Sequence, residues 1–133
     1  MTLICIMKNS LSIFVFVTLN SCLMANNDVY DAIIQVGPKG AGNDKLVKNW
    51  HLVDSMSSSD IPRMLKIMNQ ANNLGDNWAR AAILQILENA GKEGLPKDET
   101  IAFIKDQNNQ GSSRRTAYEL LDYVSPQVAQ SLV

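Results

Sequence analysis

The sequence predicts an all-α domain built from antiparallel helix pairs. After residue 27, apolar residues recur three or four positions apart and do not alternate as in a strand. Short segments rich in Gly, Pro, Asn and Ser separate these apolar stretches. The chain has 133 residues, of which 46% are hydrophobic and 19% charged, which is typical of one globular domain.

The first 22 residues predict a secretory signal peptide. Lys8 is the one charged residue between Met1 and Asn27, and the apolar run Leu11 to Leu19 follows it. A membrane-spanning helix needs about 20 apolar residues, so this run is too short to act as an anchor by itself. We therefore expect the domain proper to occupy residues 23–133, in the periplasm or cell envelope.

The segment "LNSC" (Leu19 to Cys22) resembles a bacterial lipobox. Leu19 and Ser21 match that pattern, whereas Asn20 is an unusual middle residue. The resemblance implies that Cys22 becomes a lipid-modified N-terminus, which would be the protein's one contact with a membrane. The alternative is simple secretion, with signal cleavage nearby and no lipid.

Two helices are expected in the first part of the domain. The first begins at Asp28, and the turn "GPKGAG" (residues 37–42) ends it because Gly and Pro do not readily continue a helix. The second covers residues 43–56, and Asn43 is expected to cap its free amides. The positions expected to face the core are Tyr30, Ile33, Ile34, Leu46, Val47, Trp50 and Val53.

The next pair of helices surrounds the turn "NNLGD". Asp60 is expected to cap the first of them, with Pro62 in its first turn, and residues 75–91 form the second. The expected apolar stripe of the first is Ile61, Met64, Leu65, Met68 and Ala71. The second has Ala79, Ala82, Ile83, Ile86, Leu87 and Ala90 on one face, with Trp78, Ala81 and Leu84 beyond it. A helix with so wide an apolar zone is expected to be an inner helix, covered on more than one side.

Three further helices are expected, over residues 94–107, 114–124 and 125–133. Ser125 is expected to cap the last helix and Pro126 to start it. The expected inward positions are Ile101, Phe103, Ile104, Ala117, Leu120, Leu121, Val124, Val128, Ala129, Leu132 and Val133.

Part of the chain repeats. The segment "RAAILQIL" aligns with "RTAYELLD" 35 positions later, and Pro62 aligns with Pro96 at a spacing of 34. A repeat of this length indicates an α-helical array. Because the last helix stops at Val133, we expect the chain to be the N-terminal part of a longer array or protein, or else a truncated gene product.

The stretch "GDNWARAAILQIL" resembles the second helix of a HEAT repeat, in which a turn Asp precedes a hydrophobic-Arg-x-Ala pattern. Asp76, Arg80 and Ala82 match, and Arg115 matches in "RRTAYELL", although the turn Asp is missing there. The resemblance covers roughly residues 28–133 and implies a short HEAT-like α-solenoid of an exported bacterial protein. It also implies that the structural residues at repeat junctions are Asp76, Trp78, Arg80 and Arg115.

Structural or surface roles, rather than ligand binding or catalysis, fit the remaining candidate sites best. Trp78 is expected to pack rather than bind a ligand. His51 is expected to be a solvated surface residue, and residues 37–42 lack the Lys and hydroxyl of a phosphate-binding loop. Arg114 and Arg115 could bind an anion, but a supporting contact to the adjacent turn is favoured. Glu88 and Lys92 are expected to form a weak ion pair along the helix.

The composition argues against several function classes. A net charge of −1 and 6% aromatic residues argue against a nucleic-acid surface. The two cysteines, Cys5 and Cys22, both precede the domain, so neither a disulfide nor a metal site is expected, and no cofactor is implied. No paired carboxylates or catalytic triad appear.

We therefore expect a non-catalytic scaffold or protein-interaction module of the bacterial cell envelope, with a protein partner. The alternative is an N-terminal accessory domain of a larger exported enzyme whose catalytic domain lies beyond residue 133.

Overall fold

The computed structural model describes residues 27–133, and within that range every regular element is a helix. The predicted all-α class is confirmed. The proposed signal peptide and the lipobox at Cys22 lie outside the described residues. None of the described helices is both long enough and apolar enough to cross a membrane.

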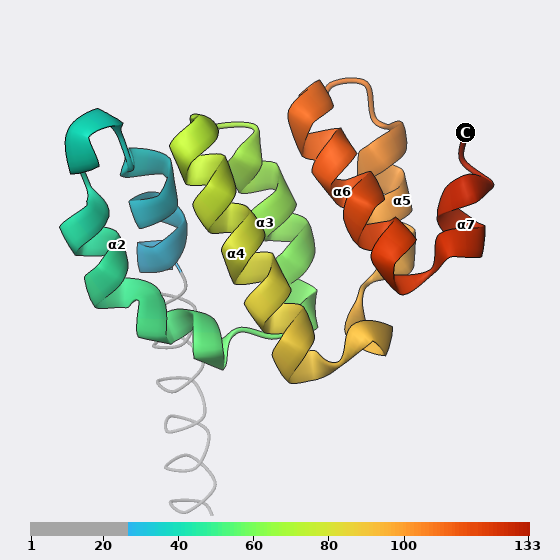
Figure 1. Ribbon diagram of the computed structural model, residues 1–133, viewed down its shortest axis with the longest axis horizontal. Coiled ribbons are helices and arrows are strands. Elements are labelled where there is room, and N and C mark those ends of the chain that lie inside the picture. The colour runs from blue at the N-terminus through green and yellow to red at the C-terminus, as the bar shows by residue number, and fades with distance from the viewer. Residues whose placement is uncertain (1–26) are drawn as a thin grey trace, which may run out of the picture.

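The helices follow one another across the molecule in sequence order, with α2, α4 and α6 drawn in front of α3 and α5 (Figure 1). α3 packs on α4, α5 packs on α6, and α6 also contacts α7. The first helix is described over residues 27–35. The further elements are η1 (Pro38–Gly40), α2 (Asn43–Asn49), η2 (Trp50–Ser55), η3 (Ser58–Asp60), α3 (Ile61–Met68), α4 (Asn73–Ala90), η4 (Lys92–Gly94), α5 (Lys97–Lys105), α6 (Gly111–Val124) and α7 (Pro126–Gln130).

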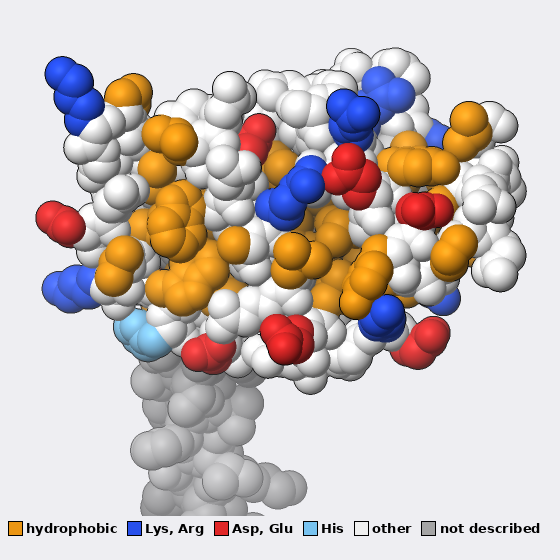
Figure 2. Space-filling view, in the orientation of Figure 1, with side chains coloured by type: hydrophobic (Ala, Val, Ile, Leu, Met, Phe, Trp, Pro, Cys, Tyr) orange, Lys and Arg blue, Asp and Glu red, His pale blue; other side chains and the backbone are white. Residues whose placement is uncertain are grey.

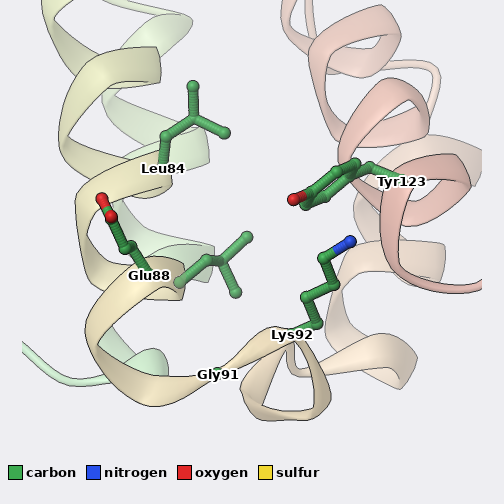
Figure 3. A pocket seen from close by; sticks show the side chains of 6 residues that line it. Leu84, Glu88, Gly91, Lys92 and Tyr123 are labelled. Carbon is green, nitrogen blue, oxygen red and sulfur yellow. The ribbon is translucent and has the colours of Figure 1, made fainter.

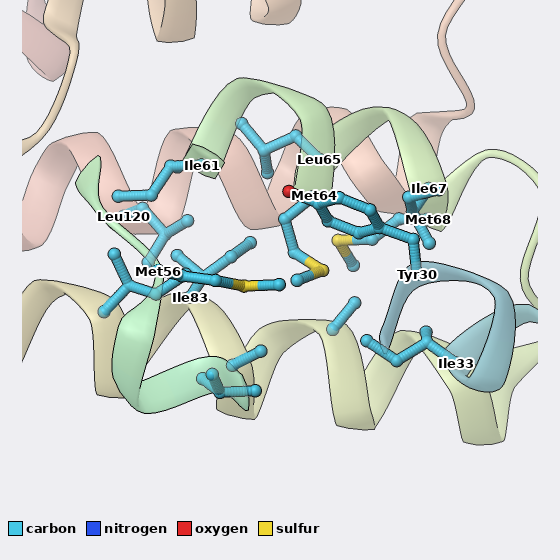
Figure 4. Packing of buried hydrophobic residues seen from close by; sticks show 14 of the residues in the cluster. Tyr30, Ile33, Met56, Ile61, Met64, Leu65, Ile67, Met68, Ile83 and Leu120 are labelled. Atoms are coloured by element: carbon cyan, nitrogen blue, oxygen red, sulfur yellow. The ribbon is translucent and has the colours of Figure 1, made fainter. Parts of the chain in front are cut away.

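One hydrophobic cluster joins these helices, and residues far apart in the sequence meet within it (Figure 4). Each large apolar side chain buried there contributes roughly 1.5–3 kcal/mol relative to an exposed one. The largest fully buried side chains include Tyr30, Ile33, Leu46, Ile61, Met64, Leu65, Met68, Ile83, Ile86 and Leu121. Most of the apolar stripes predicted from the sequence therefore do face the core.

The start of α4 is fixed by Asn72. Its side-chain oxygen accepts hydrogen bonds from the amides of Leu74 (2.9 Å) and Gly75 (3.0 Å). Its side-chain nitrogen donates to the carbonyl of Val36 at 2.6 Å, which ties α4 to the segment after the first helix. The helix begins two residues earlier than predicted because this cap precedes the Gly that had suggested a turn.

The predicted helix over residues 43–56 was wrong in three respects. It changes at Trp50 from α2 to the 3₁₀ segment η2. Asn43 is the first residue of α2 and does not cap it; Gly42, in the left-handed region at φ 78°, precedes the helix. Val47 is 65% exposed, because adjacent residues of a helix point about 100° apart and Leu46 occupies the inward direction.

Two other predicted caps do not form. The Asp60 carboxylate accepts from the Ser57 amide (2.9 Å) and from the Tyr30 hydroxyl (3.1 Å), so it supports η3 rather than α3. Ser125 precedes α7 without a side-chain capping bond. α7 ends at Gln130, so Val133 lies past the helix and is 97% exposed, not inward as predicted.

Candidate interaction surface

Three helices on the near side of the protein in Figure 1, α2, α4 and α6, carry large exposed apolar side chains. Val47 lies on α2, Leu74 and Leu84 on α4, and Tyr123 on α6; all four are large and at least 44% exposed. Figure 2 shows hydrophobic side chains continuing across this face, between scattered charged groups. We call it the α2/α4/α6 face.

On one side, α4 meets η2 through an aromatic contact. The rings of Trp50 and Trp78 lie edge to face, with centroids 5.1 Å apart and an interplanar angle of 63°. The indole nitrogen of Trp50 donates to Gln85 of α4 at 3.2 Å, and Gln85 in turn donates to Asp54. Trp78 is half-buried and packs against the hydrophobic cluster, as expected of a packing residue.

On its other side, α4 meets α6 through a polar bridge. The Arg80 guanidinium donates to the Thr116 hydroxyl (2.9 Å) and to the Glu119 carboxylate (2.8 Å). Arg115 lies 3.6 Å from the same carboxylate. Because Arg80 and Glu119 are nearly half exposed, this pair is worth less than about 1 kcal/mol.

A hollow of about 460 Å³ opens between α4 and α6 next to this bridge (Figure 3). A smaller hollow of about 120 Å³ continues from it toward Arg80 and Glu119, sharing Leu84 and Tyr123. We call the two together the α4–α6 groove. The residues lining its larger part are Leu84, Leu87, Glu88, Gly91, Lys92 and Tyr123.

The groove corrects two predictions about α4. Ala81 and Leu84 are exposed, so α4 is not covered on the α6 side and is not an inner helix in the sense predicted. Glu88 and Lys92 form no ion pair, because Gly91 turns the chain at φ 81° and Lys92 no longer follows the geometry of α4. The Lys92 ammonium instead lies 3.9 Å from the centroid of the Tyr123 ring, which is a cation–π contact.

Three of the residues implied by the HEAT resemblance line one polar hollow of about 360 Å³, between the first turns of α4 and α6: Asp76, Arg80 and Arg115. One Asp76 carboxylate oxygen is buried without a hydrogen-bond partner. Burial therefore raises the pKa of Asp76, and the nearby Arg80 charge opposes that rise. Trp78 does not share this hollow and lies instead at the η2 junction.

The other candidates are placed as follows. His51 is exposed, as expected, with its Nδ1 2.9 Å from the Lys48 carbonyl. Arg114 supports the preceding turn, donating to the Ile104 carbonyl at 2.8 Å and to Gln107 at 2.9 Å. Residues 37–42 form a turn around η1. Within residues 27–133, no group of three His, Cys, Asp or Glu side chains is arranged to hold a metal.

The sequence did not single out Glu119 and Tyr123 as groove residues. Together with Arg115 they recur every four positions along α6, outside the apolar stripe. Arg80, Leu84 and Glu88 recur in the same way along α4. This spacing indicates that each helix carries a column of side chains outside its apolar stripe, but it does not show that the two columns face each other.

No family model, no curated protein and no solved structure matches this chain. A functional proposal therefore depends on the surface of the helices themselves.

Proposed function

We propose that this protein is a non-catalytic protein-interaction module that binds through its α2/α4/α6 face. The observation that carries the proposal is the clustering of exposed apolar side chains on that face, next to the α4–α6 groove. Soluble domains rarely leave a contiguous apolar patch uncovered unless another molecule covers it. The larger part of the groove has room for several side chains of a partner.

We also propose that the helices form a short HEAT-like α-solenoid of antiparallel pairs. Side-chain amides between successive turns support it: Asn72 reaches Val36, and Asn69 donates to Asn109 at 2.8 Å. The Gln110 amide also donates to Asn69 at 3.0 Å. Solenoids built in this way present extended surfaces suited to binding another chain.

We also propose export to the bacterial cell envelope with a lipid on Cys22. The support is the sequence alone: Lys8, the apolar run after it and the lipobox-like Leu19 to Cys22. Growing cells with an alkyne-tagged fatty acid should label the wild-type chain and the matched Cys5→Ser variant, but not Cys22→Ser. Labelling that survives Cys22→Ser would contradict the lipid anchor.

The interaction proposal is tested by site-specific photo-crosslinking in the cells that make the protein. A photoreactive amino acid at Leu84 or Val47 should give discrete protein adducts. The same group at Lys66 or Lys105, exposed positions on α3 and α5, serves as the matched control and should give far fewer. Equal adduct yields from both sets of positions would contradict binding through the α2/α4/α6 face.

A further inference from the structure

The two walls of the α4–α6 groove carry complementary side chains at successive levels along its length. We call each level a row. One wall carries Arg80, Leu84 and Glu88 on successive turns of α4. The facing wall carries Glu119 and Tyr123 on α6, and Lys92 on η4. Figure 3 shows Tyr123 and Lys92 across the hollow from Leu84 and Glu88. Arg80 faces Glu119 at 2.8 Å, Leu84 and Tyr123 line the same hollow, and Glu88 and Lys92 lie at its lower end.

Each row therefore holds either opposite charges or two apolar side chains. A twofold axis running along the groove would place the α4 wall of one copy against the α6 wall of another. Leu84 would then meet Tyr123 of the second copy, and Glu88 would meet Lys92 of the second copy. A surface with this property is self-complementary, as a symmetric dimer requires.

We propose that the partner covering the α4–α6 groove is a second copy of this chain. The inference rests on the proposed function, because it names the partner of the same face. Leu84 and Tyr123, which are 47% and 57% exposed, would become buried in such a dimer. Glu88 and Lys92, which have no ion-pair partner within the described chain, would each gain one.

Charge favours a second copy over an unrelated chain. An unrelated chain would have to bring an acid to Lys92 and a base to Glu88 at the same spacing, beside apolar groups. A second copy supplies both by symmetry. The net charge of −1 also leaves little long-range repulsion between copies.

The test is a charge swap followed by sedimentation over a concentration series. The full chain is used in the form in which the expressing cells process it, so all variants share the same N-terminal region. Wild type should sediment as a dimer. Glu88→Lys and Lys92→Glu should each weaken dimerisation by about tenfold or more, because each places like charges opposite one another twice. The double variant Glu88→Lys/Lys92→Glu should recover the wild-type dimer. The two charges are exchanged, so opposite charges again face each other across the interface.

Glu99→Lys and Lys105→Glu on α5 are the matched controls, since they make the same charge changes at exposed positions away from the groove. They should leave dimerisation unchanged. A wild-type chain that stays monomeric would overturn the inference, and so would controls as damaging as the groove variants or a double variant that does not recover. A monomer that still forms crosslinks from Leu84 to another protein would leave the proposed function standing while removing this inference.

Discussion

The two sides of α4 show how one helix can be closed on one flank and open on the other. Toward η2, Trp50 and Trp78 fill the space and Gln85 adds a hydrogen bond. Toward α6, an exposed ion pair bridges the helices and a hollow remains. The backbone of α4 also lies in closer contact with η2 than with α6.

The difference lies in the residues that face α4 rather than in α4 itself. Trp50 supplies a large ring at the η2 junction, and two aromatic rings in contact exclude water there. α6 presents Glu119 and Tyr123, which are both exposed. Whether an apolar position on a helix becomes core or surface therefore depends on its neighbour.

The largest contrast is expected between Trp78→Ala and Tyr123→Ala. Trp78→Ala should lower the free energy of unfolding by about 3 kcal/mol, because it removes a ring packed against Trp50 and the core. Tyr123→Ala should cost less than about 1 kcal/mol, since the side chain is mostly exposed. Urea denaturation at concentrations where the chain is monomeric measures both. Equal losses would remove the distinction between the two flanks.

A second contrast compares the first turns of α4 and α6. A methyl group added at Gly75 would lie 2.6 Å from the Ile33 carbonyl oxygen and 2.8 Å from the Ala71 Cβ. Gly75→Ala should therefore destabilise the protein by about 2 kcal/mol. At Gly111 the added group would meet nothing within 4 Å, so Gly111→Ala should stabilise by about 0.5 kcal/mol. Thermal melts of the two variants check the opposite signs, and a stabilising Gly75→Ala would contradict the close approach of the first helix.

The Arg80–Glu119 bridge should contribute about 0.5 kcal/mol. A double-mutant cycle of Arg80→Met and Glu119→Gln isolates its coupling energy from the other contacts of each residue. High salt should reduce the coupling, because both groups are exposed to solvent. A coupling of several kcal/mol would show that the α6 flank is as firmly closed as the η2 flank.

Asp76 should give the smallest effect, visible as a pH dependence. Because burial raises its pKa, the folded protein binds this proton more tightly than the unfolded chain does. The group's contribution to the free energy of unfolding should then rise as the pH falls from the raised pKa to the ordinary value of 3.8. Asp76→Asn should be slightly more stable than wild type at neutral pH, and the gap should close in acid. A stability difference between the variant and wild type that widens in acid would contradict the raised pKa of Asp76.

Most of the helical architecture could be predicted from the sequence. Stripes such as Ile61, Met64, Leu65 and Met68 have one buried face and a clear period, so their helix and its orientation follow directly. Caps were harder: Asn72 was identified only as part of a turn, because several Asn residues near it could serve as caps. The tertiary contact of Asn72 with Val36 is not visible in local sequence.

The groove could not be predicted because it depends on pairing between helices. Leu84 has the same apolar character as Leu87, yet it is exposed whereas Leu87 is buried. Leu87 lies on the face of α4 that packs in the hydrophobic cluster, whereas Leu84 lies on the flank toward α6, where the groove leaves it uncovered. Lys92 was likewise predicted to form an ion pair with Glu88 because they lie four residues apart. Gly91 follows the end of α4 between them, so they are not on one helix.

The most direct test of the open flank is the solvent exposure of neighbouring methyl groups on α4. In the Glu88→Lys variant, whose groove should remain uncovered, a soluble paramagnetic agent should strongly broaden the NMR signals of the Leu84 methyl groups. The signals of Ile83 and Ile86, which are fully buried, should be almost unaffected. Broadening at Leu84 no greater than at Ile86 would contradict the account, because α4 would then be covered on both flanks.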